Sequence, residues 1–516
     1  MVSKTFRMLI IVTMFAATFA YAPPAMAGSA ACDKRVNNTF KKLLECVTLE
    51  GAREHQAALQ AIADANNGIR TSGTPGFDES IAYAEQVFTD AGYNVTIQPF
   101  EFQTFISLSP SILEQVSPPP AGPIENNIMS YSGSGDVTAA VSIPSGDFRG
   151  CEAADFAGFP AGNIALISRG APAGFPVACT FGLKATNAYN AGAAGVVIYN
   201  NAPGAISGTL GNTFTLDIPV TSVTQEVGQQ LAATAGLVLR LKTDTFRGIA
   251  TTYNIFAESK KGNPNNVVMV GAHLDSVNAG PGIQDNGSGS AAILEVAEQM
   301  AKVKPRNKVR FALWGAEEAN LVGSTYYVNN LSAEERDRIA LYLNFDMIGS
   351  PNHVFFIYDG DDSDAVGAGP GPAGSAEIEQ TFEAYYTMQG LPFKGTDFTG
   401  RSDYGPFIAV GIPSGGLFTG AEGIKTPDEV ALWGGTAGQQ YDPCYHLACD
   451  TYDNINLSAY DVNVDAVAFA TLQYAMSTKD VNGAKGKGNF PSVSGSTSIS
   501  GNANDSGRHD HELVTE

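Results

Sequence analysis

The stretch Val267–Gly289, VVMVGAHLDSVNAGPGIQDNGSG, decides how the rest of the chain is arranged. It begins with a short, β-branched apolar run, Val267–Val270, which predicts a strand buried on both faces. After the run come His273 and Asp275, and a glycine-dense loop then carries Asp285 toward a helical segment. Ligands of open α/β sheets bind outside the carboxyl ends of the strands. The stretch therefore predicts an α/β sheet with a metal site at the end of this strand.

Two later apolar segments end in acidic residues in the same way. Lys308–Trp314 is followed by Glu317 and Glu318, and Ile339–Phe345 is followed by Asp346. Because parallel strands bring their carboxyl ends to one edge of a sheet, we expect these side chains to meet there. A single histidine or glutamate pair after a strand is usually structural or solvated, so the agreement of three strands is what favours a site.

Imidazole nitrogen and carboxylate oxygen together suit Zn²⁺. A catalytic zinc takes about three protein ligands and a water, so a larger donor set fits two zinc ions that share one carboxylate. Asp285 is the expected bridge, since its loop lies between the groups on the strands. Of the adjacent Glu317 and Glu318, one is expected to bind metal and the other to act as a general base. Asp275 is expected to accept the second ring N–H of His273 and fix its tautomer.

The length of 516 residues predicts two domains with appendages. A hydrophobic content of 44% and a charged content of 16% are typical of a globular protein. The chain carries 30 Lys and Arg against 52 Asp and Glu, a net charge of −22, which argues against nucleic acid or an anionic membrane as a partner. Between Pro118 and Arg247 the sequence changes to short β-type runs rich in glycine and alanine, and the α/β pattern returns after them.

Residues 1–27 have the pattern of a signal peptide. Lys4 and Arg7 precede the apolar segment Met8–Ala20, and an A-x-A pattern ends at Ala27. We therefore expect cleavage near Ala27 and a secreted protein, extracellular or periplasmic. The apolar segment is too short to span a bilayer and no later segment reaches 18 apolar residues, so no membrane association is expected. A monomer is expected.

Six cysteines fit an oxidising compartment. The simplest of the fifteen possible connectivities joins sequence neighbours: Cys32 with Cys46, Cys151 with Cys179, and Cys444 with Cys449. No C-x-x-C motif supports a zinc knuckle. Residues 479–516 are polar and of low complexity, which predicts a disordered tail in which His509 and His511 are solvated.

Residues 118–247 resemble a protease-associated (PA) domain. The features that carry the resemblance are the strand Ile164–Ile167, the pair Arg169-Gly170, a helix with Lys184, the sequence AGAAGVVIYNN at 191–201, and the strand Ile218–Val220. No histidine and few carboxylates occur in this part of the chain. It is therefore assigned no catalysis and is expected to form a lid or wall beside the site.

Five motifs in the remaining sequence resemble the M28 family of di-zinc aminopeptidases, most of all its secreted bacterial members. They are HLDS at 273–276, DNGSG at 285–289, WGAEE at 314–318, NFDMIG at 344–349 and CYHLACDT at 444–451. The resemblance implies a mixed, mostly parallel sheet flanked by helices. It divides the chain into the N-terminal part of a peptidase domain (28–117), the inserted PA domain (118–247) and the catalytic part (248–478).

The resemblance also implies a role for individual residues. His273 and Asp346 would hold one zinc, Glu318 and His446 the other, and Asp285 would bridge them. Glu317 would be the general base, and the phenol of Tyr445 would polarise the scissile carbonyl. Arg401, in GRSDYGPF, resembles a residue that contacts substrate. Asp461 and Asp465 resemble a calcium site, which makes Ca²⁺ a second candidate cofactor.

The predicted function is a secreted zinc aminopeptidase that removes N-terminal residues from peptides with a metal-activated water and Glu317 as base. Acidic side chains such as Glu317 and Asp346 would attract the α-ammonium of the substrate. One alternative is a carboxypeptidase or dipeptidase, which needs a cation for the α-carboxylate; Arg401 is the obvious candidate. A non-catalytic PA-containing binding protein and a one-zinc glutaminyl cyclase are further alternatives, and both fit poorly with a complete set of five ligands.

Overall fold

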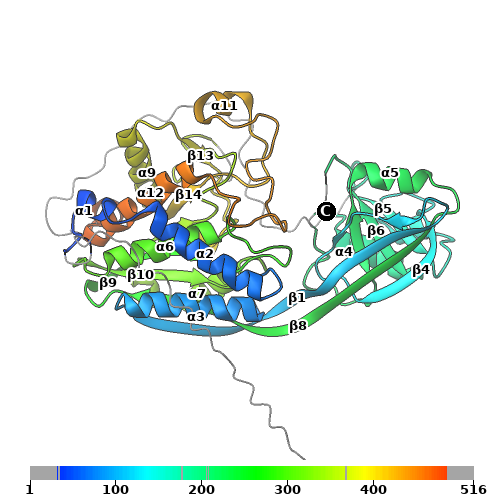
Figure 1. The fold of residues 1–516 in the computed structure, drawn as a ribbon, viewed down its shortest axis with the longest axis horizontal. Helices are drawn as coiled ribbons and strands as arrows, with labels where there is room; N and C mark the ends of the chain where they lie inside the picture. Colours follow the sequence, from blue (N-terminus) through cyan, green and yellow to red (C-terminus); the bar gives the residue numbers. More distant parts are fainter. Residues whose placement is uncertain are drawn as a thin grey trace, which may run out of the picture.

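The computed structural model describes residue 32 and residues 35–484, apart from 176, 177, 205, 207 and 366–368. The expected signal peptide and residues 485–516 of the expected tail lie outside the described residues. Two lobes are visible in Figure 1, a larger α/β lobe and a smaller β-rich lobe. They are joined by two long antiparallel strands, β1 (Asn94–Ser117) and β8 (Val238–Glu258).

The centre of the larger lobe is a group of parallel strands, as the apolar runs predict. β9 (Asn263–His273) lies between β10 (Asn307–Trp314) and β11 (Ile339–Phe345), and β14 (Ser414–Phe418) lies beyond β11. These pairings are parallel, whereas β8 joins β10 in the antiparallel sense. The sheet ends in two short strands, β12 (Phe356–Tyr358) and β13 (Lys394–Thr396). The expected mixed, mostly parallel sheet is confirmed.

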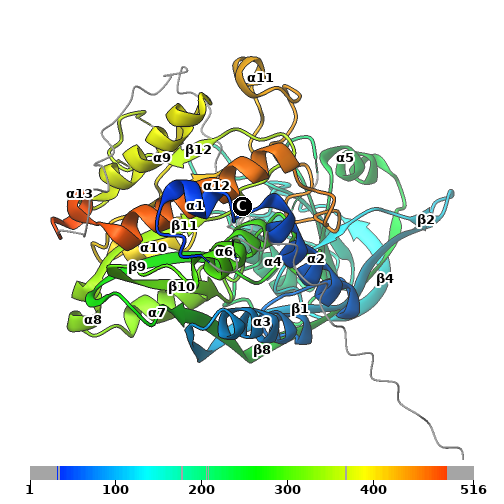
Figure 2. The same cartoon turned by 60° about the vertical axis from the view of Figure 1, so that its left-hand side comes forward.

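Helices cover both faces of this sheet because successive residues of the central strands point to opposite sides. Val268 and Val270 join one hydrophobic cluster, and Val267 and Met269 join the other. The first face is covered by α1 (Phe40–Leu44), α2 (Leu49–Ala65), α3 (Pro75–Asp90), α6 (Gly287–Met300), α9 (Ser375–Gln389) and α12 (Leu457–Met476). Of these, α6 and α12 contact β9 and β10, and α6 lies in front of them in Figure 2. The second face carries α7 (Val322–Asn329) and α10 (Tyr404–Ala409).

Short helices lie at the margins of the larger lobe. α8 (Ala333–Arg338) leads directly into β11, and α11 (Pro427–Trp433) follows β14. α13 (Lys479–Asn482) follows α12, so these residues are helical where the sequence predicts the start of a disordered tail. Within the described residues, no helix is both long and apolar enough to cross a lipid bilayer.

The smaller lobe extends the same run of strands. β4 (Gly135–Ser142) pairs with β8 on one side and with β5 (Ile164–Ser168) on the other, followed by β6 (Gly195–Tyr199), β7 (Val220–Val223) and β3 (Asn127–Ile128). β2 (Gly122–Pro123) pairs with β1. The 3-10 helix η2 (Ala153–Phe156), α4 (Phe181–Asn190) and α5 (Gln225–Ala233) complete this lobe. Its strands pack into two hydrophobic clusters of their own.

The chain passes between the lobes within unbroken strands. β8 runs straight through the expected boundary at 247, and Leu113 of β1 already packs in the core of the smaller lobe. The point at which β1 passes from the larger lobe to the smaller lobe therefore lies nearer to Phe105 than to Pro118. Phe246 and Ile249 are exposed at this point, where the strand pair bridges the two lobes.

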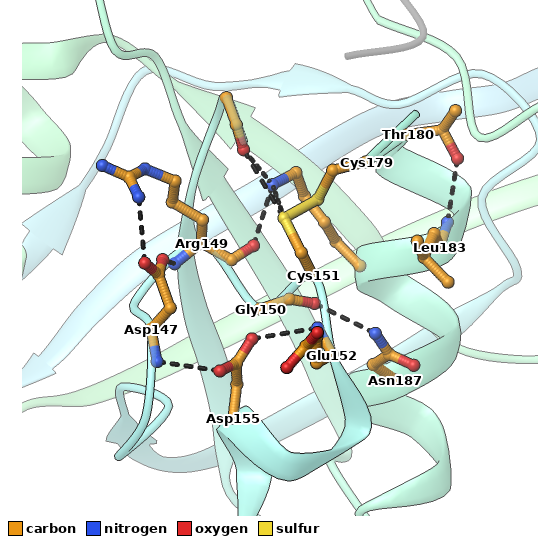
Figure 3. The surroundings of a disulfide bond; sticks show 12 residues. Asp147, Arg149, Gly150, Cys151, Glu152, Asp155, Cys179, Thr180, Leu183 and Asn187 are labelled. Atoms are coloured by element: carbon orange, nitrogen blue, oxygen red, sulfur yellow. Dashed lines mark hydrogen bonds and ion pairs between the residues drawn. A yellow bond between two sulfur atoms is a disulfide. The ribbon is translucent and has the colours of Figure 1, made fainter. Parts of the chain in front are cut away.

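The structure pairs the cysteines as predicted: Cys32 with Cys46, Cys151 with Cys179, and Cys444 with Cys449. Figure 3 shows the second of these, which links the segment before η2 to the start of α4. Lys184 lies fully buried beside it and donates from Nζ to the carbonyls of Gly170 at 2.6 Å and Arg149 at 2.8 Å. The buried lysine thus has a structural role in this loop.

Candidate metal centre

The sheet brings the predicted groups to one edge. His273 is the last residue of β9 and lies opposite Trp314, the last residue of β10. Glu317 and Glu318 follow β10, and Asp346 follows the neighbouring strand β11. This is the arrangement that the parallel register predicts.

The loop before α6 supplies Asp285 to the same place. Asn286 caps α6 by accepting a hydrogen bond from the amide of Gly289 at 2.9 Å, and its own amide donates to the carbonyl of Phe345 at 2.9 Å. The start of the helix therefore lies against the end of β11. A Cβ at Gly289 would collide with the Phe345 carbonyl, so this close approach requires glycine.

Two imidazole–carboxylate sets meet at Asp285. Nε2 of His273 lies 3.3 Å from Oδ1 of Asp285 and 3.3 Å from Oδ1 of Asp346. Nε2 of His446 lies 3.2 Å from Oδ2 of Asp285 and 3.2 Å from Oε2 of Glu318. The two oxygens of one carboxylate thus face two different histidines.

These distances fit metal ions held by the same atoms. Two ligands, each about 2.0–2.1 Å from a tetrahedral zinc, lie about 3.3 Å apart. The donor atoms are imidazole nitrogen and carboxylate oxygen, which zinc accepts. His273, Asp285 and Glu318 form one compact group of possible ligands, and His273, Glu317 and Asp346 form another. The residues therefore fit a pair of metal ions with Asp285 between them.

The electrostatics of the protein groups also favour a cation. Burial raises the pKa of Glu317 well above its usual value and that of Glu318 to about 7. Burial lowers the pKa of His446, but the carboxylates of Glu318 and Asp285 outweigh this effect and raise it to about 10. The carboxylates destabilise one another's charge in this buried space, and bound cations would relieve that repulsion.

Asp275 contacts His273 mostly through its backbone. Nδ1 of His273 lies 3.1 Å from the Asp275 carbonyl and 3.6 Å from its Oδ1. The same Oδ1 accepts a hydrogen bond from the amide of Glu317 at 3.2 Å. The side chain therefore helps to position Glu317 as well as His273, a contact that the sequence does not reveal.

Three further residues support the centre without having been predicted. Ser402 donates from Oγ to Oδ2 of Asp346 at 2.6 Å. Asp450 accepts hydrogen bonds from the amides of Gln284 at 2.8 Å and Asp285 at 3.0 Å. Arg70 is fully buried and donates to the carbonyls of Leu274, Pro281 and Gly282. Ser402 follows Arg401 and Asp450 lies in CYHLACDT, so motif position could have indicated both; no signal marks Arg70.

The remaining predicted residues lie at different distances from the centre. Tyr445 is half-buried, and its ring stacks on that of His446 with centroids 3.8 Å apart. Arg401 is half-buried between β13 and α10, and its charge acts on Glu422. Asp461 and Asp465 lie one turn apart on α12, away from the metal ligands, and Glu50 of α2 acts on Asp461.

A cavity of about 550 Å³ opens from the centre toward the smaller lobe. At one end it is lined by Asp275, Glu318 and His446. At the other it is lined by hydroxyl, amide and aromatic side chains, among them Asn212 and Tyr131. Among the described residues of its lining, none is a lysine or an arginine. The smaller lobe thus forms one wall of the space beside the metal centre.

Comparison with known proteins identifies both parts of the chain. Residues 254–471 match the model of peptidase family M28, and residues 134–231 match that of the PA domain. An aminopeptidase of Pseudomonas aeruginosa is 48% identical over 455 residues, which cover 85% of this chain and 83% of that protein. The chain belongs to peptidase family M28. The expected family and its inserted PA domain are therefore confirmed.

The chain is also similar to other aminopeptidases. Leucine aminopeptidase 2 of Trichophyton rubrum is 49% identical over 337 residues, 64% of this chain and 66% of that protein. The aminopeptidase from Aneurinibacillus sp. strain AM-1 superposes with a TM-score of 0.61 at 28% identity, covering 84% of this chain and 96% of that structure. The zinc aminopeptidase BSAP from Bacillus subtilis gives 0.61 at 26% identity, with 82% and 94% covered.

Proposed function

We propose that this M28 peptidase is an exported zinc aminopeptidase, which hydrolyses the first peptide bond of substrates that carry an unblocked α-amino group. The observation that carries the proposal is the pair of imidazole–carboxylate sets that share Asp285, with Glu317 beside them. The aminopeptidase names of relatives at 48–49% identity and of two structural neighbours support it.

We assign the ligands of two zinc ions as follows. His273 and Asp346 would hold one, Glu318 and His446 would hold the other, and Asp285 would contribute to both. A bound zinc pair supplies Lewis acidity toward a water molecule and toward the scissile carbonyl. Ser402 and the Asp275 carbonyl keep Asp346 and His273 in the orientation that binding requires.

Glu317 is proposed as the general base. Its carboxylate is fully buried, with Oε2 3.9 Å from Nε2 of His273, and its amide is fixed by Asp275. It takes one proton from the attacking water, whose oxygen joins the acyl carbon. As the C–N bond breaks, Glu317 passes that proton to the leaving amine nitrogen. Burial raises its pKa, which makes the carboxylate a better proton acceptor than an exposed one.

Tyr445 is proposed to stabilise the developing oxyanion. Burial and the charges of Glu422 and Asp285 raise the pKa of the phenol well above its usual value. The hydroxyl therefore keeps its proton and can donate it in a hydrogen bond as negative charge forms on the carbonyl oxygen. The acidic surroundings also favour a substrate α-ammonium.

The cavity favours an aminopeptidase over a carboxypeptidase or dipeptidase. Its described lining offers no lysine or arginine to neutralise an α-carboxylate, and Arg401 is not part of it. The non-catalytic alternative fits poorly with the five ligand residues, all of which converge at one place.

Hydrolysis of aminoacyl p-nitroanilides by the purified mature protein tests the function. Each substrate is paired with its N-acetylated form, and the assay is repeated after chelation and after Zn²⁺ is returned. The expected result is cleavage of the unblocked substrates alone, lost on chelation and restored by about two zinc ions per chain. Equal cleavage of acetylated substrates, or no cleavage of any substrate by a protein with two zinc ions bound, would overturn the proposal.

Two further measurements test the expected export and oligomeric state. Mass spectrometry of the secreted protein tests cleavage near Ala27, and sedimentation tests whether the protein is a monomer.

We also propose that Asp461 and Asp465 hold a calcium ion. Burial and the charge of Asp461 raise the pKa of Asp465 to about 7, so a cation would relieve the repulsion between them. The Asp461→Asn/Asp465→Asn variant should lose one bound Ca²⁺ in an equilibrium titration. Unchanged stoichiometry would contradict this assignment.

A further inference from the structure

A second concentration of carboxylates lies away from the metal centre. The loop after β12 has the sequence DGDDSD, residues 359–364, and packs against the start of α9. A Cβ at Gly360 would overlap the backbone of Ser375, so loop and helix are in direct contact. None of these acids belongs to the ligand set that surrounds Asp285.

Three carboxylates of this region face one another. Oxygen atoms of Asp359, Asp361 and Glu379 lie within 4.8 Å of each other. Asp359 is 1% exposed and Glu379 is 4% exposed, while Asp361 is open to solvent. Oε2 of Glu379 accepts a hydrogen bond from the amide of Gly360 at 2.8 Å, which holds the helix side chain on the loop.

Glu383 adds an independent observation. It lies one turn beyond Glu379 on α9 and is only 7% exposed. Among the described residues, none donates a hydrogen bond to its carboxylate or pairs with it. Burial and the negative charges of Asp364, Asp361 and Asp359 raise its pKa to about 7. A buried carboxylate that faces only like charges is unfavourable unless a cation or a proton compensates it.

The ligand atoms of this carboxylate cluster indicate which kind of cation it would bind. Every side chain of the cluster offers oxygen, without imidazole or thiolate, and such a set suits Ca²⁺ better than Zn²⁺. Asp359, Asp361 and Ser363 alternate along the loop, as oxygen ligands do in many calcium loops, and glutamates from a following helix complete such sites.

We propose that Asp359, Asp361, Glu379 and Glu383 form a calcium site that is separate from the metal centre. The ion ties the loop to α9 and so fixes the neighbouring strand. The amide of Asp359 donates to the carbonyl of Thr396 at 3.0 Å, and Asp364 accepts from the amide of Gly395 at 2.7 Å. The chain leaves this strand for the segment that carries Ser402, so calcium would stabilise the segment that supports Asp346.

Calorimetric titration with CaCl₂ tests the site in the full protein, which is treated with EGTA, freed of the chelator and then reloaded with Zn²⁺. The Asp461→Asn/Asp465→Asn background removes the other candidate calcium site. One Ca²⁺ per chain is expected in this background. Glu383→Gln and Asp361→Asn should each weaken binding at least ~10-fold, because affinity depends on the number of charged ligands. Glu377→Gln, the same change at a partly exposed position of α9, should leave binding unchanged.

If Glu383→Gln disturbs folding because Glu383 is buried, Asp361→Asn still tests the site, since the Asp361 side chain is exposed. As a second readout, Ca²⁺ should raise the thermal unfolding midpoint of the background protein but not that of Asp361→Asn. The proposal would be overturned if the background protein bound no calcium, or if Glu383→Gln and Asp361→Asn both bound it as tightly as the background protein. The compensating charge would then be assigned to protons on Glu379 and Glu383.

Discussion

At the scale of single residues, some side chains of the metal centre could be predicted from the sequence and others could not. His273, Glu318 and Asp346 could be predicted because each follows an apolar strand and parallel strands share an edge. Arg70 could not, because its hydrogen bonds join it to residues 204 to 212 positions further along the chain. Such contacts depend on how loops cross the finished fold, which local patterns do not encode.

Glu317→Gln should lower kcat by about 10²–10⁴-fold and leave the zinc content unchanged, because an amide cannot take the proton from water. KM should change little, since the ligands of the metal ions remain. Assays on an aminoacyl p-nitroanilide, with zinc measured on the same samples, check this. Glu334→Gln, on the surface of α8, is the control. A variant with near-normal kcat would remove Glu317 from the proton transfer.

Ser402→Ala should weaken zinc binding by about 10–100-fold, because Asp346 loses the 2.6 Å hydrogen bond that orients it. Competition with a chelator measures the affinity, and activity should return in excess zinc. Ser414→Ala removes another buried hydroxyl whose partner is the Ile412 carbonyl, and so controls for a general loss of stability. Equal zinc affinity in both variants would contradict a positioning role.

At the scale of elements, strands and helices near the site follow their sequence patterns closely, whereas β1 does not. Prolines usually interrupt a strand, but β1 extends from Asn94 to Ser117 in spite of Pro99 and Pro110. Proline is tolerated where one side of a strand needs no partner. β1 pairs along its length with β8, and its register shifts near Pro110. The prolines therefore mark an edge strand and a bulge, not an end.

Gly289→Ala tests how closely α6 must approach β11. The added methyl would press on the Phe345 carbonyl and displace Asn286, so the free energy of unfolding should fall by about 1–3 kcal/mol. Zinc affinity should fall as well, because Asp285 precedes the cap. Denaturant unfolding measures the change. Gly122→Ala, where nothing lies within 4 Å of the new Cβ, is the matched control and should be nearly neutral.

At the scale of the whole molecule, β1 and β8 join two domains that the sequence predicts as separate units. Composition predicts the insert, because its glycine-rich sequence differs from the flanking α/β pattern. It could not show that β8 runs through both lobes, because alternating strand residues look alike on either side of the crossover. This continuity joins the two lobes (Figure 1), and residues of the smaller lobe line the cavity beside the metal centre.

The position of the smaller lobe predicts a dependence on substrate length. Asn212 lines the cavity that opens from the metal centre. A substrate that continues past the scissile bond would reach this wall, whereas an aminoacyl p-nitroanilide would end near the metal centre. Asn212→Trp, at an exposed position of that wall, should therefore lower kcat/KM for a tetrapeptide several-fold and leave the anilide unaffected. Gln229→Trp places the same side chain on exposed α5 away from the cavity and should change neither substrate. Equal effects of Asn212→Trp on both substrates would mean that the wall acts on the metal centre itself, and no effect on either would mean that peptides leave the site by another path.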